Sequence, residues 1–434
     1  MQKIKSQIPP AIFFLIFLNL IFTRSFVGLR IFGFRLGEYI VLIGFLLLFV
    51  FTVYLIKYEP KKEIRTISII LFYFIFQLLI TQANLLNTYT FKAGSFIAMI
   101  SFFYLGTTFP HENIYVKKLR IFLPVLLPFV YVFGSSIYPK FISSFFINYS
   151  DKFQFVKASD VLMVLIIVIF YYNNFQDKKW NYVFIFLIIP AFLPLLLYLS
   201  RGSFVALVVF LFMELFSFRK ELIKNLLKTT LFMFLAILVF IISTFNIYGN
   251  LSFEKSNPLI NAELERTQTE VLQDNLQDLL ERRNYIGVIF SLYFDEGTLK
   301  STDGTLNWRL DIWQDLINDM NDENKQLFGY GYNEILPAMT DASEPGRMGK
   351  DGMNENIHNY FLNVYARGGL VLLSLFLFLH YLFIKRWKKI NGDFRLANFI
   401  IPLLIASFFD VSMEGVQFPL NYYFFVGTFL ALKS

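Results

Sequence analysis

The chain has 434 residues, of which 56% are hydrophobic and only 16% are charged. Soluble domains carry roughly 25% charged residues, so this composition argues against a soluble protein and indicates one whose solvent is the lipid bilayer. The absence of cysteine excludes disulfides and thiolate metal sites. The formal charge of +7 is explained by its distribution along the chain, and we expect no nucleic-acid partner.

Apolar runs long enough to cross roughly 30 Å of hydrocarbon recur along the sequence. The first follows Lys3 and Lys5 and is similar to a signal peptide, but no small-residue cleavage site follows it, so we expect a retained helix. We expect about twelve spans, at residues 8–28, 37–56, 64–82, 91–109, 119–137, 158–173, 182–200, 203–218, 226–247, 358–384, 396–411 and 415–432.

The apolar stretch from Tyr182 to Phe218 is too long for one span, because a straight helix of that length would extend roughly 55 Å. Ser200-Arg201-Gly202-Ser203 lies at its middle. Gly202 permits a turn and Arg201 marks an aqueous edge, so we expect the chain to reverse direction there.

Lysine and arginine are unequally distributed between alternate loops, with 21 on the side of the N-terminus and eight at the short loops and helix ends of the other side. This bias places the N- and C-termini in the cytoplasm and favours an even number of spans. The sequence therefore predicts an all-α polytopic membrane protein. Transmembrane regions at 1–247 and 358–434 flank one large extracytoplasmic loop, 248–357.

The large loop contains 20 of the 32 acidic residues and has two segments with helical periodicity. The first begins near Asn257-Pro258. The second begins after Thr302-Asp303-Gly304, and we expect its apolar face to lie on the membrane surface or on the helix bundle. This face comprises Leu310, Trp313, Leu316, Ile317 and Met320.

His358 is the only histidine expected at the extracytoplasmic boundary, because His111 falls in a cytoplasmic loop and His380 in the inner half of a span. Arg201 and Arg309 are expected on the same side. An imidazole can accept a proton near neutral pH, and guanidinium groups bind phosphate oxygens, so the set suits attack by a hydroxyl and departure of a diphosphate. The alternatives are an interfacial polar residue for His358, a snorkelling anchor for Arg201 and a solvated charge for Arg309.

Arg367 lies nine residues after His358, and a cation at that depth must face the bundle interior or an aqueous cavity. No Asp-x-Asp pair or His/Glu cluster has metal-ligand spacing, so no metal or cofactor is expected. Arg24, Arg30 and Arg35 lie outside, against the charge bias, and fit either an anionic lipid head group or simple interfacial anchoring.

Four short stretches, in this order, resemble the O-antigen ligase and Wzy-type O-antigen polymerase superfamily. They are Leu199-Ser200-Arg201-Gly202, the segment Trp308-Arg309-Leu310-Asp311-Ile312-Trp313, the turn Leu327-Phe328-Gly329-Tyr330-Gly331, and His358-Asn359 followed by Gly369. They cover roughly the C-terminal half of the chain. This sequence departs from the family pattern at Arg367, where many members carry Glu.

The resemblance implies a metal-independent inverting glycosyltransferase of the bacterial inner membrane that acts on its extracytoplasmic face. The implied donor is a glycan on undecaprenyl diphosphate. His358 would be the general base, Arg201 and Arg309 would bind the diphosphate, and Asn359 would orient His358 or the acceptor. Supporting roles fall to Gly202, Trp313, Tyr330, Gly331 and Arg367. Whether a chain-length regulator protein takes part stays open.

Three functions remain open on the sequence. A polymerase that joins lipid-linked repeat units of a surface polysaccharide is preferred, because the large loop and the departures from the family pattern favour it over a ligase. The ligase would transfer the finished glycan to lipid A–core or another acceptor. A flippase or transporter of lipid-linked glycans is the third, although the sequence shows no matching halves.

Overall fold

The computed structural model describes residues 10–58, 61–85, 87–108, 113–135, 138–151, 156–176, 180–249, 251, 292–295, 297–302, 304–340, 357–410 and 412–432. The helix predicted near Asn257 and the residue His111 lie outside these ranges. The chain forms two compact units. Unit 1 comprises Met1–Leu36, Pro110–Phe290 and Ala397–Ala406, and unit 2 comprises Gly37–Phe109, Ser291–Leu396 and Ser407–Ser434.

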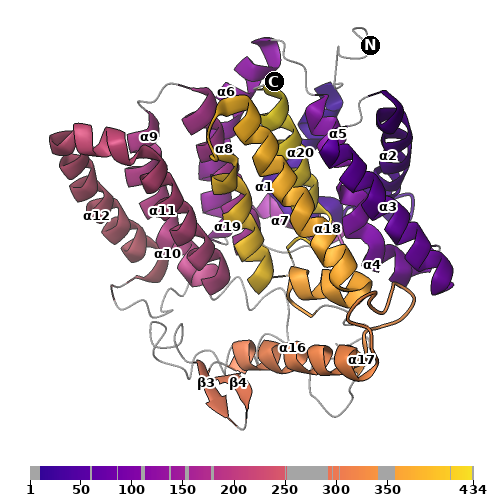
Figure 1. Cartoon of the computed structure of the whole chain (residues 1–434). Helices are drawn as coiled ribbons and strands as arrows, with labels where there is room; N and C mark the ends of the chain where they lie inside the picture. Colours follow the sequence, from indigo (N-terminus) through magenta and orange to yellow (C-terminus); the bar gives the residue numbers. More distant parts are fainter. Residues whose placement is uncertain are drawn as a thin grey trace. The chain divides into compact units, whose positions relative to one another are not determined.

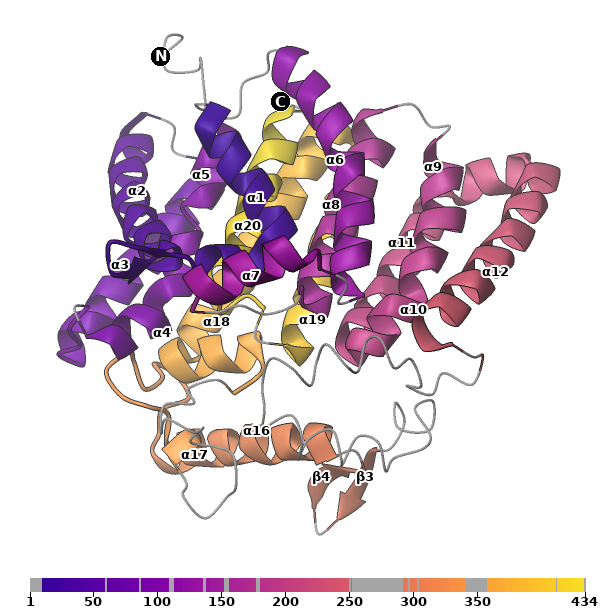
Figure 2. The same cartoon turned by 180° about the vertical axis from the view of Figure 1, so that it is seen from behind.

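Unit 1 is built from long apolar helices (Figures 1 and 2). Its elements are α1 (Pro10–Val27), β1 (Arg30–Ile31), β2 (Phe34–Arg35), α6 (Asn113–Gly134), α7 (Lys140–Tyr149), α8 (Ala158–Phe175), α9 (Trp180–Val183), the π-helical turn η1 (Phe184–Ile188), α10 (Ile189–Leu199), α11 (Arg201–Lys224), α12 (Leu226–Tyr248) and most of α19 (Leu396–Phe409). The almost uniformly apolar α8 is buried along nearly its whole length and packs against α6, α10 and α11, as expected for a helix without a polar face.

The predicted reversal in the middle of the 182–218 stretch is confirmed, but its physical basis differs from the expectation. Ser200, and not Gly202, provides the turn: its backbone is extended (φ −162°, ψ 124°) and its side chain accepts from the Ser203 amide at 3.5 Å. Gly202 lies inside the first turn of α11. Serine favours this helix-capping position because its oxygen satisfies an otherwise unpaired amide.

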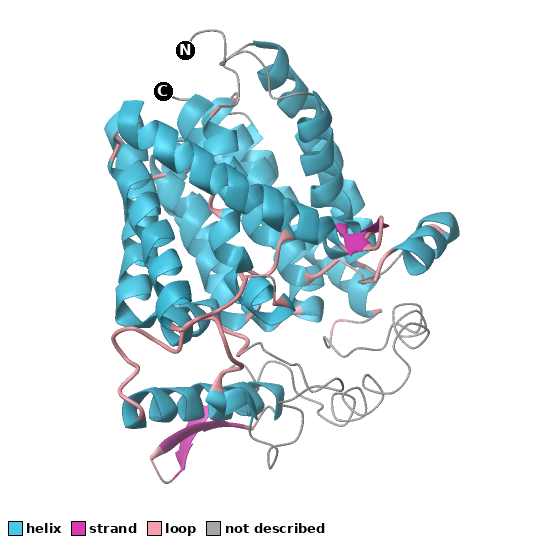
Figure 3. Ribbon diagram, turned by 90° about the vertical axis from the view of Figure 1, so that its right-hand side faces the viewer, coloured by secondary structure: helices cyan, strands magenta, loops and turns pink. Residues whose placement is uncertain are grey.

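Unit 2 contains the remaining helices and one small hairpin. Its elements are α2 (Leu36–Tyr58), α3 (Lys62–Ile80), α4 (Thr88–Met99), α5 (Phe102–Thr107), β3 (Leu292–Asp295), β4 (Thr298–Ser301), α16 (Gly304–Asp322), α17 (Pro337–Thr340), α18 (Tyr360–Asn391), the end of α19 and α20 (Gln417–Leu432). Figure 3 shows that, apart from the two short antiparallel hairpins, the described elements are helical.

The span expected at 91–109 is divided into α4 and α5, and α5 packs closely on α20. Two glycines allow this approach. A Cβ on Gly106 would lie 2.1 Å from the Phe424 carbonyl oxygen, and one on Gly427 would lie 2.3 Å from the Phe103 carbonyl oxygen. Close contact between backbones through small residues is a general way in which membrane helices associate.

Each expected span contains a described helix, and among the described residues seven helices are long and apolar enough to cross a membrane. The protein is therefore a helical multi-pass membrane protein. Three shorter apolar helices, Phe14–Val27, Leu119–Gly134 and Leu396–Phe409, fall on other expected spans. The count of twelve, the cytoplasmic termini and the three regions 1–247, 248–357 and 358–434 remain predictions.

The helix predicted after Thr302-Asp303-Gly304 is confirmed as α16, but its buried face is rotated relative to the expectation. Ile312 is buried and Ile317 is exposed, whereas Trp313, Leu316 and Met320 are buried as expected. The reason is that residues 312, 313, 316 and 320 follow helical spacing on a single stripe, and this stripe packs against α17 and α18 within the unit.

Candidate functional site

His358 precedes the start of α18, where the chain makes a capped turn. Asn359 is fully buried, and its Oδ1 accepts from the amides of Phe361 at 3.0 Å and Leu362 at 3.2 Å. An asparagine cap satisfies amides that have no partner within the helix. His358 itself has a left-handed backbone conformation (φ 55°), which is uncommon outside glycine. The cap therefore fixes the backbone directly after His358 at the start of α18.

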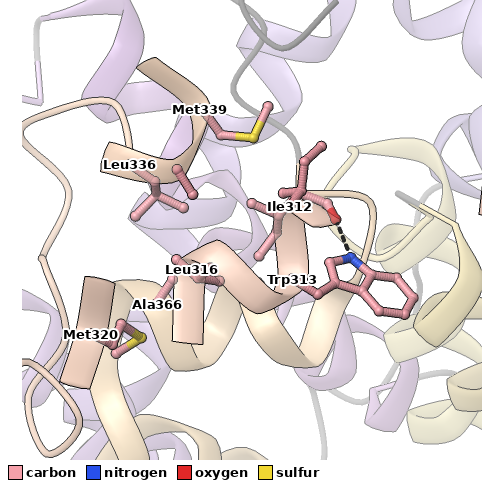
Figure 4. Close-up of a cluster of buried hydrophobic side chains, with 9 residues drawn as sticks. Ile312, Trp313, Leu316, Met320, Leu336, Met339 and Ala366 are labelled. Atoms are coloured by element: carbon pink, nitrogen blue, oxygen red, sulfur yellow. Dashed lines mark hydrogen bonds between the residues drawn. The ribbon is translucent and has the colours of Figure 1, made fainter. Parts of the chain in front are cut away.

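The loop helix α16 holds this turn from one side. The Trp313 indole donates from Nε1 to the Ile357 carbonyl oxygen at 2.6 Å, which anchors the peptide directly before His358 (Figure 4). The Trp308 ring lies edge-on to the imidazole, with 5.2 Å between centroids. Trp313 thus anchors the backbone directly before His358, and Trp308 packs against the His358 ring.

Arg309 follows Trp308 on α16 and is partly buried. Its Nη1 donates to the Phe409 carbonyl oxygen at the end of α19, a contact inside unit 2. A guanidinium group has five N–H donors, so it can bind a carbonyl and further acceptors at the same time. The structure thus places an arginine one residue from the aromatic partner of His358.

The helix α18 is interrupted at Gly369, which has a left-handed backbone (φ 63°, ψ −168°). The loop that carries Gly329-Tyr330-Gly331 fills the interruption with backbone hydrogen bonds. The amides of Tyr330 and Gly331 donate to the carbonyls of Ala366 and Arg367 at 2.7 and 2.9 Å. On the other side of the break, the amides of residues 370 and 371 donate to the carbonyls of residues 326 and 327 at 2.8 and 3.3 Å.

Two side chains from α3 complete the pairing at this break. The Tyr73 hydroxyl donates to the Gly368 carbonyl oxygen at 2.7 Å, and Gln77 Nε2 donates to the Phe328 carbonyl oxygen at 2.6 Å. Both contacts satisfy carbonyls that would otherwise lie unpaired beside the helix bundle. We refer to residues 326–331 together with residues 366–371 of α18 as the loop clasp.

Arg367 is buried, with 2% of its surface exposed, and it binds groups of the protein itself. Its Nη1 donates to the carbonyls of Gly331 at 3.2 Å and Glu334 at 2.7 Å, and its Nη2 donates to the Tyr89 hydroxyl. The expectation that this cation faces the interior of the bundle is thus met. These contacts make Arg367 a support of the loop clasp, and its predicted supporting role at the functional site stays a prediction.

Tyr330 and Gly331 belong to the loop clasp through their backbones. A Cβ at Gly329 would lie 2.6 Å from the Ala366 carbonyl oxygen, so the first glycine of this turn is needed for the close approach of the two chains. Burial raises the pKa of the Tyr330 hydroxyl well above its usual range, so the phenol stays neutral at physiological pH. Tyr330 can therefore donate or accept a hydrogen bond but cannot act as a base.

The predicted site residues fall into both units. Unit 2 contains His358, Asn359, Arg309, Trp313, Tyr330, Gly331 and Arg367. Unit 1 contains Arg201 and Gly202, which occupy the first turn of α11. The prediction that Arg201 shares a pocket with His358 and Arg309 therefore stays a prediction, and within unit 2 the histidine, the two tryptophans and Arg309 come from adjoining elements.

The sequence analysis missed Tyr73, Gln77 and Tyr89. A signal for the first two was present: a tyrosine and a glutamine four residues apart lie on one face of the apolar stretch 64–82. Polar side chains in a membrane helix face other protein groups, so this pair predicts a contact. Nothing in the sequence indicates that the contact is with the backbone of a loop 250 residues away.

Comparison with known families identifies residues 185–377 as matching the family described as O-antigen ligase. This range contains all nine of the predicted site residues, from Arg201 to Arg367. A comparison with curated proteins finds no match to the chain. The resemblance drawn from the four short stretches is confirmed by the family match.

The loop clasp predicts a difference between two glycines with left-handed backbones, Gly369 inside α18 and Gly392 directly after its last residue. A Cβ at Gly369 would lie 2.2 Å from the backbone of Leu327, whereas one at Gly392 (φ 76°) meets nothing within 4 Å. Gly392→Ala should therefore cost only about 1 kcal/mol, the conformational penalty alone. Gly369→Ala should abolish recovery of monodisperse protein or lower its melting temperature far more, as measured by size exclusion and thermal unfolding in detergent. Equal behaviour of the two variants would refute the clasp.

Replacement of Arg367 tests its role as a support. Arg367→Met leaves two carbonyls and one hydroxyl without their donor, so we expect a loss of about 2–4 kcal/mol and a melting temperature several degrees lower. Tyr89→Phe removes one of the contacts and should have a smaller effect. Arg219→Met is the control, because Arg219 donates only to a carbonyl three residues away on its own helix. A melting temperature of Arg367→Met equal to that of the control would contradict this role.

Proposed function

Because residues 185–377 match the family described as O-antigen ligase, we propose that this membrane protein is a glycosyltransferase that polymerises a surface polysaccharide. It transfers a glycan from undecaprenyl diphosphate to a hydroxyl at the non-reducing end of the next lipid-linked repeat unit, on the extracytoplasmic side of the inner membrane. The observation that carries this proposal is the placement of His358 at the capped start of α18, where its ring contacts Trp308 of α16. Arg309 is the residue after Trp308.

In the proposed reaction His358 acts as the general base. The acceptor hydroxyl attacks the anomeric carbon, its proton passes to the imidazole, and the bond from that carbon to the diphosphate oxygen breaks. Attack from the side opposite the diphosphate inverts the configuration. General bases must be held within hydrogen-bond reach of the proton they take, which gives a purpose to the restraint of the His358 ring and backbone.

The leaving diphosphate gains negative charge as the glycosidic bond breaks, and Arg309 and Arg201 are proposed to stabilise it. Guanidinium groups bind phosphate oxygens through paired N–H donors and remain charged at every physiological pH. Arg309 is supported by its position directly after Trp308 on α16, whose ring contacts His358. Arg201 is supported by its place in the first turn of α11, where the helix dipole also favours an anion.

Asn359 is proposed to act on the acceptor rather than on His358. Its Oδ1 is already committed to the cap of α18, which leaves the Nδ2 amide as its remaining polar group. Nδ2 is buried and has no hydrogen-bond partner within the described part of the chain. A buried amide without an acceptor is unfavourable, and a sugar oxygen would satisfy it.

A ligase reaction is the second candidate, because the matched family is described as O-antigen ligase. In this reaction the same groups would transfer a finished glycan to lipid A–core. The two functions predict different phenotypes for a deletion of the gene. Loss of the polymerase should leave single repeat units attached to the core, whereas loss of a ligase should leave core without any repeat unit. Electrophoresis of extracted lipopolysaccharide distinguishes the two banding patterns.

Turnover by the purified protein tests the chemistry. With its lipid-diphosphate repeat unit as the only substrate, the wild type should produce a ladder of products. His358→Gln, Arg309→Gln and Arg201→Gln should each reduce the rate at least ~100-fold, the size typical for loss of an acid–base group or a charge stabiliser. Arg219→Gln, at the other end of α11 from Arg201, should keep the wild-type rate. A His358→Gln variant that elutes as folded protein and retains full activity would reject His358 as the base.

A further inference from the structure

Two segments of unit 1 that are more than 100 residues apart in sequence are fastened together beside the end of α1. The first is the β1–β2 hairpin and the second is the short helix α7. Leu29 forms a β-bridge with Ser150, the Asp151 amide donates to the Gly28 carbonyl at 3.1 Å, and the Ser150 hydroxyl donates to the Ser25 carbonyl at 2.7 Å. We call residues 28–35 and 138–151 together the interfacial platform.

The platform concentrates positive charge around one carboxylate. Arg30 and Arg35 are directly opposite each other in the hairpin, an arrangement of like charges that is unfavourable by itself. Asp151 lies between them, with its carboxylate oxygens 2.5 Å from Arg30 Nε and 3.1 Å from Arg35 Nε. The hydrogen bond from Arg30 lowers the pKa of Asp151, so the carboxylate stays ionised. Among the residues of the platform itself, Arg30, Arg35 and Lys140 carry three positive charges, and Asp151 carries one negative charge.

The same platform exposes a set of large apolar side chains. Phe32 at the tip of the hairpin is 95% exposed. Along α7, Phe141, Phe145 and Tyr149 are spaced four residues apart, so they form one exposed aromatic stripe. Phe146, on a different side of α7, is buried and contacts α1, where the Phe146 and Phe22 rings lie 5.0 Å apart. In water, such an exposed stripe would be unfavourable.

The length and direction of α7 indicate what covers this stripe. Its ten residues extend about 15 Å, half of what is needed to cross the hydrocarbon, so α7 does not span the membrane. It connects the end of α6 with the start of α8, and Figure 2 shows it running across the direction of α1, α6 and α8. An amphipathic helix that lies across the ends of spanning helices is in the position of the membrane–water interface.

We propose that the interfacial platform is a lipid-binding surface that selects anionic phospholipids. Phe32 and the aromatic stripe of α7 insert among the acyl chains, and Arg30 and Arg35 bind the phosphate of an anionic head group. Aromatic rings favour the interface, and guanidinium groups bind phosphate oxygens bidentately. The Arg30 side chain is 64% exposed, so it can be reached by a head group. This role is independent of glycosyl transfer, because it needs neither the donor nor the acceptor.

Depth measurement with spin labels tests the apolar half of the proposal. The chain contains no cysteine, so each single-cysteine variant carries one label without further changes. In nanodiscs, labels at Phe32→Cys and Phe145→Cys should collide more often with oxygen, which concentrates in lipid, than with a water-soluble nickel complex. Phe294→Cys is the matched control, a phenylalanine 79% exposed in the β3–β4 hairpin, and its label should be the more accessible to nickel. Nickel accessibility at residues 32 and 145 equal to that at 294 would overturn the proposal.

Retention of lipid by the full chain tests the head-group half. Native mass spectrometry should show phosphatidylglycerol retained in preference to phosphatidylcholine, and Arg30→Gln and Arg35→Gln should each weaken this retention roughly fivefold, in line with about 1 kcal/mol per basic residue near an anionic membrane surface. Lys300→Gln is the control, because Lys300 forms a comparable exposed ion pair with Asp295 in the other hairpin. Equal retention of the two lipids by the wild type would reject anionic selectivity. Unchanged retention by a variant that combines Arg30→Gln with Arg35→Gln would also reject it.

Discussion

The interruption of α18 at Gly369 is the constraint on which the rest of unit 2 depends. A break in a helix beside the hydrocarbon releases carbonyl and amide groups, and each of these is strongly unfavourable there unless the protein supplies a partner. Here the partners come from one loop on both sides of the break and from the hydroxyl of Tyr73. Beyond the break, residues 370–391 extend about 33 Å, which is enough to cross the membrane. The short segment before it is thereby free to serve another purpose.

That segment follows directly on the proposed catalytic base. It begins at the cap formed by Asn359, directly after His358, and it ends at Arg367, where the guanidinium group ties the same loop to α4 through Tyr89. The loop in turn continues from α16, whose two tryptophans hold the histidine. The same connected set of contacts therefore satisfies the backbone groups at the break in α18 and holds the proposed base in place.

Hydropathy was sufficient to predict a helix in each expected span, because the bilayer imposes length and apolarity on every span, but it did not predict the short helix α7. The spacing of apolar residues was also sufficient to predict α16. Its buried face differs in one position, because Ile312 is buried where Ile317 was expected to be. Hydropathy could not reveal the break in α18, since Gly368-Gly369 within an apolar run is equally compatible with a continuous helix. The partners of Arg367 and the hairpin-to-α7 contact join residues far apart in sequence, and no local pattern encodes such pairings. The diphosphate-binding role of Arg201 was predicted from its charge and its place in the sequence. Arg201 and His358 belong to different units, so this role stays a prediction.

The chemistry of the groups around residue 367 sets which amino acids can replace one another there. Two carbonyl oxygens face that position, and both can only accept hydrogen bonds. An ionised glutamate also only accepts, so at this position it would be repelled by the two oxygens that hold arginine. With an acid at 367, residues 331–334 would have to follow a different path. A substitution at 367 and changes in that short stretch are therefore expected to depend on each other.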